Sequence, residues 1–363
     1  MPLTTRVRVG VIGTSEHTQS VHLASLKSHP GADVVAICGR DQARARRVAA
    51  AFEIPGVFAD YRRMIEAAEI DLLVVVAPDD LHYPITLDAL DRGLHVLCEK
   101  PLARNLAEAR RMYERAEAVG VKHMTFFSWR WPPAQRFVKQ LIDNGYVGRG
   151  FDASLSFCHG FGRDDRYSWR FDGARSAGVL GDLGSHLIDL VRWYFGEVTG
   201  VSARLTHVVD RRSADGMDAT PTNDAGLLTL QLAGGAQAAI QVSALARVAD
   251  REVEQRIVVH GSEGSLEASY SALGTEVRGT RDGDAAFRVL PIPDELWGDA
   301  DRTNPLAVLK SLPVGDRQMI DAILADRPVT PSFYDGMKTQ EVIDAALRSD
   351  REGRWVEANE FRR

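Results

Sequence analysis

Two side chains that could move a proton together lie four residues apart in the stretch 177–193. Apolar residues recur around Asp182 and His186 at the three- and four-residue steps of an amphipathic helix. At this spacing the carboxylate and the imidazole lie on the same helix face. A neighbouring carboxylate fixes the tautomer of an imidazole and raises its basicity, which suits a general base. A helix-start aspartate beside a buried core histidine gives the same pattern, and the spacing alone favours that alternative.

A third candidate for chemistry follows an apolar run early in the chain. The segment 94–98 is nearly all apolar and leads directly into Glu99, Lys100 and Pro101. Two charges at the end of a buried strand are costly unless they are paired or functional. Lys100 is therefore a candidate for the reacting end of a binding site.

The elements that must position Lys100 alternate regularly along the first third of the chain. The expected strands are 6–13, 33–38, 71–76, 94–98 and 121–127, and the expected helices are 42–52, 61–68, 81–92 and 106–119. Strands that are apolar throughout and alternate with helices indicate a parallel sheet covered on both faces. Such a sheet binds ligands outside the carboxyl ends of its strands. Six residues that follow the third and fourth of these strands are expected to contact a cofactor. They are Ala77, Pro78, Asp79, His82, Glu99 and Lys100.

The loop after the first strand is a weak form of a dinucleotide-binding loop. In a G-x-G-x-x-G loop the glycines let the backbone approach a pyrophosphate, but here Gly13 is followed by Ser15 and Thr18 at the other two glycine positions. The hydroxyl groups of Thr14, Ser15 and Thr18, with free N–H groups at the helix start, can still bond phosphate oxygens.

The residues after the second strand bear on the choice between nicotinamide coenzymes. An acidic residue there would bond the ribose 2′-hydroxyl and repel a 2′-phosphate. Gly39 leaves room instead, and Arg40, with Arg44 nearby, offers positive charge. If a dinucleotide binds, the sequence favours NADP over NAD. An exposed loop arginine without a ligand is the alternative.

Composition and length limit the remaining possibilities. A chain of 363 residues is expected to hold two domains. The formal net charge of −6 argues against nucleic acid or an anionic membrane as a partner. Three cysteines lie far apart without a CxxC pair, which suits a reducing compartment and predicts neither a disulfide framework nor a zinc site. With no signal peptide or membrane-spanning run apparent, a cytoplasmic protein is expected.

Beyond the central helix the pattern changes to that of an antiparallel sheet. Strand-like segments at 150–157, 201–209, 225–232, 236–243, 252–260 and 265–270 are mostly separated by glycine-bearing turns, and helices are expected at 316–325 and 334–349. We therefore predict an α/β protein. Its N-terminal domain, residues 1–127, is a doubly wound parallel sheet of the Rossmann type that binds NAD(P). Its C-terminal α+β domain, residues 128–363, has a large, mainly antiparallel open sheet whose outer face would need covering.

Two motifs together are far more specific than the glycine loop. The sequence CEKP at 98–101 is followed some eighty residues later by GDLGSHLID at 181–189. With VGVIG near the start, SWRFDGARSAG before the central helix and HGSEGSLE late in the chain, the sequence resembles the glucose–fructose oxidoreductase/inositol dehydrogenase/MocA (Gfo/Idh/MocA) family over nearly its whole length. It departs from the family pattern in the missing loop glycines and at Asp79, where the family commonly has asparagine.

The resemblance implies an NAD(P)-dependent dehydrogenase or reductase acting on sugars, inositols or related polyols and their ketones. It also implies that Lys100, Asp182 and His186, which stand at the matching motif positions, form the catalytic group. It further implies subunit pairing through the C-terminal sheet, so a homodimer or homotetramer is expected. Aromatic faces and guanidinium groups suit sugar rings, and the substrate candidates beyond the catalytic group are Trp129, Arg130, Tyr167, Trp169 and Arg170.

Two alternatives come from other functional classes. Asp182, His186 and Asp189 could ligate a metal ion in a lyase or hydrolase, but no clear second cluster of ligands is visible, so no metal is expected. The imperfect phosphate loop also fits a non-catalytic NADP-binding regulatory protein. The retained lysine, aspartate and histidine argue against that alternative.

Overall fold

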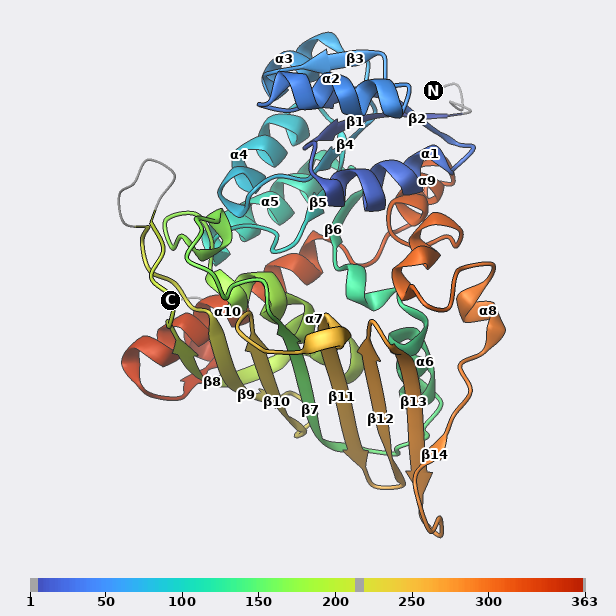
Figure 1. Ribbon diagram of the computed structural model, residues 1–363, viewed down its shortest axis with the longest axis vertical. Coiled ribbons are helices and arrows are strands. Elements are labelled where there is room, and N and C mark those ends of the chain that lie inside the picture. Colours follow the sequence, from blue (N-terminus) through green and yellow to red (C-terminus); the bar gives the residue numbers. More distant parts are fainter. Residues whose placement is uncertain (1–5, 213–218, 362–363) are drawn as a thin grey trace. The chain divides into compact units, whose positions relative to one another are not determined.

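The computed structural model describes residues 6–212 and 219–361, which divide into two compact units (Figure 1). One unit comprises the chain up to residue 127 together with residues 307–337, and the other comprises 128–306 together with the chain from 338 onward. The segment 307–337, which the sequence pattern placed with the second domain, therefore packs with the first unit. Its docking depends on buried contacts with the first helix, which periodicity does not reveal.

The first unit is built on a six-stranded parallel sheet. Its strand order is β3-β2-β1-β4-β5-β6, so the order reverses between β1 and β4 at the sheet centre. The strands are β1 (Val7–Ile12), β2 (Ala32–Cys38), β3 (Gly56–Phe58), β4 (Leu72–Val75), β5 (His95–Glu99) and β6 (His123–Phe126). The four residues of β4 and of β6 are all buried, as expected for strands covered on both faces.

Helices connect these strands. They are η1 (Thr18–Leu23), which has π geometry, α1 (Ala24–Lys27), α2 (Gln42–Ala51), α3 (Tyr61–Ala67), α4 (Asp79–Leu90) and α5 (Leu106–Val119). The late segment adds η6 (Pro305–Lys310) at its start and then α9 (Asp316–Leu324). The strand β3 was not predicted, because three half-buried residues leave no apolar run.

The second unit contains a nine-stranded sheet in the order β14-β13-β12-β11-β7-β10-β9-β8-β15. Its strands are β7 (Gly150–His159), β8 (Val198–Thr206), β9 (Ala225–Leu232), β10 (Gln237–Ser243), β11 (Val253–Gly261), β12 (Gly264–Ser271), β13 (Gly274–Arg281), β14 (Arg288–Val289) and β15 (Val356–Glu357). Strands β7 and β10 pair in parallel, and the other pairs are antiparallel. The predicted fold class is confirmed.

One face of this sheet is covered by helices and forms the core of the unit (Figure 1). The helices of the second unit include η2 (Ser128–Arg130), α6 (Pro133–Asp143), η3 (Trp169–Phe171), η4 (Leu180–Gly184), α7 (Ser185–Phe195), η5 (Ala249–Arg251), α8 (Asp294–Trp297) and η7 (Ala358–Glu360), and α10 (Phe333–Glu352) continues into it from the late segment. Helix α7 packs on β7 and β10. Along β9 and β10 buried and exposed residues alternate, so the opposite face is open. Among the described residues, no helix has the length and apolarity needed to cross a membrane.

Candidate active site

Gly13 closes the turn at the end of β1. Its φ of +115° is rare for other residues, and a Cβ at this position would lie 2.2 Å from the carbonyl oxygen of Val76. The loop therefore passes directly against the end of β4, at the point where the strand order reverses. A glycine cradle at this place leaves backbone N–H groups accessible to a phosphate.

Ser15 and Thr18, which replace the other two loop glycines, bond to each other. Their hydroxyl oxygens are 2.9 Å apart, and the backbone N–H of Thr18 donates to the Ser15 hydroxyl at 3.1 Å. Thr18 is fully buried, whereas Ser15 is exposed. Thr18 thus supports the loop from inside, and Ser15 is the hydroxyl that a ligand can reach.

The end of β2 is shaped by a second close approach. A Cβ on Gly39 would lie 2.6 Å from Cγ2 of Thr14, so the two loops touch. Arg40 and Arg44 are exposed beside them. The Asp41 carboxylate accepts the backbone N–H of Arg44 at 2.9 Å, which caps α2 and lowers the pKa of Asp41.

His82 joins the loops that follow β4 and β5. Its Nδ1 lies 2.8 Å from the carbonyl oxygen of Pro101 and its Nε2 lies 2.8 Å from that of Ala77. Burial lowers the pKa of His82, although both carbonyl groups oppose the shift. Because His82 is buried and both ring nitrogens are occupied, it fixes these loops. Asp79 is the buried first residue of α4.

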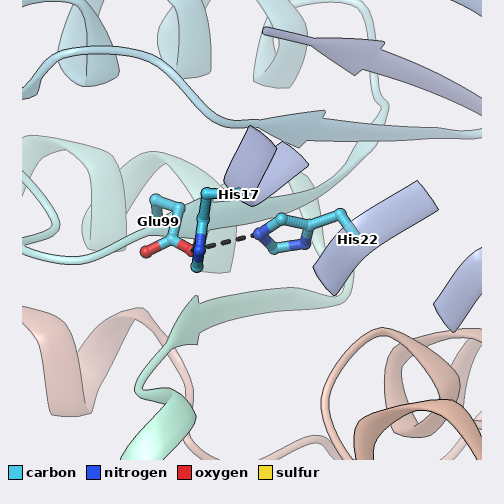
Figure 2. Close-up of side chains that lie close together, drawn as sticks. All are labelled: His17, His22 and Glu99. Atoms are coloured by element: carbon cyan, nitrogen blue, oxygen red, sulfur yellow. Dashed lines mark hydrogen bonds and ion pairs between the residues drawn. The ribbon is translucent and has the colours of Figure 1, made fainter. Parts of the chain in front are cut away.

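Glu99 is the centre of a buried cluster that sequence reasoning missed (Figure 2). Its Oε1 lies 2.7 Å from Nε2 of His17 and 3.0 Å from Nε2 of His22. The other nitrogen of His22 lies 2.9 Å from Oδ1 of Asp316. The ligand atoms of His17, His22 and Glu99 lie within 4.8 Å of one another, close enough to share a metal ion. Two histidines five positions apart after the first strand were the available sequence signal.

Opposite charges and burial act against each other in this cluster. Burial lowers the pKa of His22, but the carboxylates of Asp316 and Glu99 outweigh it and raise that pKa to about 10. Burial raises the pKa of Glu99, but His17 and His22 bring it well below its usual value. Lys100 is partly exposed, and its backbone N–H donates to Oε2 of Glu99 at 3.1 Å.

In the second unit, the Asn223 side chain forms hydrogen bonds that stabilise the start of the central helix. Its Oδ1 accepts the N–H of Leu180 and its Nδ2 donates to the carbonyl of Ala177, each at 2.8 Å. Between them Gly178 has a φ of +65°, and a Cβ there would lie 2.6 Å from the carbonyl oxygen of Asn223. Sequence reasoning missed Asn223, because no local pattern links it to a helix that begins forty residues earlier.

The central helix begins with π geometry rather than as the continuous α-helix expected. Asp182 lies in the π segment η4, and His186 lies in the first turn of α7. Short π segments inside helices are frequent at functional sites. The periodicity of apolar residues did not distinguish the two geometries.

Asp182 lines a pocket of about 600 Å³ in the second unit. Of the expected substrate residues, Tyr167 and Arg170 line it too, and the Trp169 ring lies 4.5 Å from the Arg170 guanidinium. The full lining is His159, Phe161, Asp164, Arg166, Tyr167, Ser168, Arg170, Phe171, Asp182 and Arg211.

The arginines of this pocket are paired with carboxylates. Arg170 Nε lies 3.4 Å from Oδ2 of Asp182. Arg166 pairs with Asp164 at 2.6 Å. The buried Arg211 pairs at 2.7 Å with Asp224, which is also buried. These six charges sum to zero.

His159 is a further residue of this pocket that sequence reasoning missed. Its Nδ1 accepts the backbone N–H groups of Gly160, at 2.8 Å, and Phe161, at 3.1 Å. Since Nδ1 is an acceptor, the proton of the neutral ring is on Nε2. Burial lowers the pKa of His159, and Asp182 opposes the shift. The ring is therefore a neutral hydrogen-bond donor at neutral pH.

Trp129 and Arg130, also expected to bind substrate, lie in the interior of the second unit. Arg130 donates two hydrogen bonds to Asp189, at 2.7 and 2.6 Å, and both side chains are buried. Trp129 packs on Phe157, with ring centroids 5.1 Å apart, and lies 6.5 Å from the ring of the buried His186. Asp189 thus neutralises Arg130, and among the described residues it forms no metal-ligand group with Asp182 and His186.

Comparison with known proteins agrees with this organisation. A family model described as an oxidoreductase family with an NAD-binding Rossmann fold matches residues 7–127, and a model of the Gfo/Idh/MocA C-terminal domain matches residues 135–267. Inositol 2-dehydrogenase 4 of Saccharopolyspora erythraea is 30% identical over 310 residues, which cover 82% of this chain and 86% of that protein. D-apiose dehydrogenase of Paraburkholderia graminis is 29% identical over 339 residues, covering 93% and 86%.

Solved structures show the same architecture. Levoglucosan dehydrogenase in complex with NADH and levoglucosan matches with a TM-score of 0.87 and 25% identity, over 97% of this chain and 99% of that chain. An oxidoreductase domain protein from Kribbella flavida matches with a TM-score of 0.87 and 26% identity, over 98% and 99%. A dinucleotide-binding parallel sheet joined to an open α+β unit defines a class of oxidoreductases. The chain belongs to the Gfo/Idh/MocA family. It is an enzyme, a dehydrogenase that acts on CH–OH groups.

The buried Arg130–Asp189 pair makes a testable contribution to stability. Replacing Asp189 by alanine leaves the Arg130 guanidinium buried without its carboxylate, and we expect a loss of about 3–5 kcal/mol in the free energy of unfolding. The control Asp294→Ala removes one partner of an exposed pair with Arg302 and should cost about 1 kcal/mol or less. Urea unfolding followed by circular dichroism measures both, and equal losses would contradict the assignment.

Proposed function

We propose that this enzyme interconverts a secondary hydroxyl group and a ketone on a neutral sugar, inositol or related polyol, with NADP as the preferred coenzyme. The observation that carries the proposal is that Asp182, Tyr167 and Arg170 line one pocket whose arginines are already paired with carboxylates. The relatives named above for inositol, D-apiose and levoglucosan support the choice of substrate class.

The pocket offers what a polyol needs. Paired guanidinium and carboxylate groups present donors and acceptors side by side, which suits vicinal hydroxyl groups. The rings of Phe161, Tyr167 and Phe171 offer apolar surface to the C–H faces of a sugar. His159 adds a neutral donor. The carboxylate beside each guanidinium repels an anionic substrate, so neutral sugars are favoured.

The first unit has the residues to hold the coenzyme. On the turn made by Gly13, whose own N–H donates to the carbonyl oxygen of Cys38, Thr14 and Ser15 would bond the pyrophosphate. Arg40 and Arg44 would bond the 2′-phosphate of NADP. Thr18 and His82 would support these loops from inside, beside Gly39, Ala77, Pro78 and Asp79. When bound, the coenzyme supplies the carbon that accepts or returns a hydride. NAD is the alternative coenzyme.

The catalytic roles follow from the motif positions of three residues. In the oxidation direction His186 takes the hydroxyl proton, and Asp182 orients its imidazole and stabilises the imidazolium. Lys100 donates a hydrogen bond to the oxygen as it becomes a carbonyl, while the hydride leaves the same carbon for the coenzyme. Lysine and histidine could exchange the acid and base roles.

Replacing Lys100 by methionine tests this assignment. We expect kcat to fall about 10²- to 10⁴-fold, because a proton-transferring or oxygen-bonding group is lost at similar volume. The coenzyme Kd, measured by nicotinamide fluorescence, should change less than about threefold. The exposed Lys27→Met is the matched control. A Lys100→Met enzyme with full activity on a polyol substrate would refute the proposal.

Coenzyme preference can be tested at Arg40. Loss of one charged hydrogen bond costs about 1.5–3 kcal/mol, so Arg40→Ala should raise the KM for NADP about 10- to 100-fold and leave that for NAD nearly unchanged. Arg46→Ala, at an exposed position on the nearby helix α2, is the control. If Arg40→Ala weakens both coenzymes equally, or neither, the preference for NADP is wrong.

We also propose a homodimer or homotetramer that covers the open face of the second sheet. Leu227 on β9 is 58% exposed on this face, beside the small side chains of Ser154 and Ser202. Leu227→Lys should convert the wild-type oligomer to a smaller species, as measured by size-exclusion chromatography with light scattering. Leu273→Lys, at a turn outside this face, is the control. A monomeric wild-type enzyme would contradict this part.

A further inference from the structure

His22 links three separate parts of the first unit. Its fully buried ring, on η1, lies between Glu99 at the end of β5 and Asp316 at the start of α9. Asp316 follows His22 by 294 positions in the chain. The first helix, the strand that carries the EKP motif and the late segment thus meet at one imidazole.

A neutral His22 ring can donate to only one of two ionised carboxylates, whereas a ring that carries a proton on both nitrogens can donate to both at once. The pKa of about 10 agrees with this state. The imidazolium lies between two negative groups in a region without water access, where such attraction is strong.

Glu99 is held on both of its oxygens. Oε1 accepts from His22 and from the half-exposed His17, and Figure 2 draws these three side chains. Oε2 accepts the backbone N–H of Lys100. A carboxylate with both oxygens engaged has little freedom to rotate. The backbone from which the Lys100 side chain projects is therefore fixed by Glu99.

We propose that His22 is a positioning residue for Lys100, and that Asp316 acts through it. The inference rests on the proposed catalytic role of Lys100. It assigns the late segment a part in the reaction: Asp316 keeps His22 charged and oriented, His22 holds Glu99, and Glu99 sets the backbone at Lys100.

A divalent cation is the competing occupant of the same cluster. Two imidazoles and a carboxylate are a known ligand set for zinc. A doubly protonated His22, in contrast, would donate to both carboxylates and keep no lone pair for a metal ion. Elemental analysis of the purified enzyme decides the point, since stoichiometric zinc that is lost in a His22 variant would overturn the proposal.

The test compares His22→Gln with a matched control, His29→Gln. His29 also bonds α9, through Asp321 at 3.1 Å, but makes no contact with Glu99. We expect His22→Gln to lower kcat about 10- to 100-fold, as a small displacement of a catalytic group does, with the coenzyme KM changed less than about threefold. His29→Gln should lower kcat less than about threefold.

Asp316→Asn provides a second variant of nearly unchanged volume. It should also lower kcat. In the double variant with His22→Gln, the loss of kcat should be smaller than the two single losses combined predict. Circular dichroism confirms that each variant is folded. Equal losses of kcat in His22→Gln and His29→Gln would mean that His22 only docks α9, and this would overturn the proposal.

A measurement independent of turnover separates this inference from the proposed function. The ¹⁵N signals of the His22 ring should show both nitrogens protonated at pH 8, where an ordinary histidine is neutral. A neutral ring at pH 8 would overturn this inference alone. A fully active Lys100→Met enzyme would instead overturn the proposed function, whatever the state of His22.

Discussion

The constraint on which the first unit depends is a carboxylate buried at the end of a strand. Glu99 cannot remain charged in the interior without donors and opposite charge close by. His17 and His22 supply both, and His22 in turn requires Asp316. Helix α9, from the far end of the chain, therefore contacts the rest of the first unit through Asp316. Apolar packing holds the same late segment, since Phe333 is fully buried in the core of the first unit.

The strands and helices of the first unit were predictable because their signal is local. A strand covered on both faces is apolar at every position, as in the fully buried β4, and the helices between such strands keep a clear period. The elements that escaped prediction lack that signal. Strand β3 is short and half-buried, and β13 lies in a polar stretch that is stabilised by its neighbour β12. The place of α9 is set by contacts with residues nearly three hundred positions away.

The candidate site shows the same division between local and distant information. The motifs located Lys100, Asp182 and His186, but the supports of the central helix come from Asn223 and from backbone geometry at Gly178. Residue type alone also misplaced two candidates. A tryptophan and an arginine suit a sugar pocket and a protein interior equally well. Arg130 lies in the interior because its guanidinium donates two hydrogen bonds to the buried Asp189. His159 was missed because its role as a donor depends on which ring nitrogen accepts the backbone N–H groups of Gly160 and Phe161.

Charge pairing in the second unit limits how its pocket can discriminate between ligands. Because each arginine of the pocket already has a carboxylate partner, an anion bound there would meet a negative charge beside each guanidinium. Hydroxyl groups, in contrast, can bond to both members of a pair without separating them. Specificity at such a surface depends on the number and direction of hydroxyl groups, since a missing partner leaves a polar group unsatisfied.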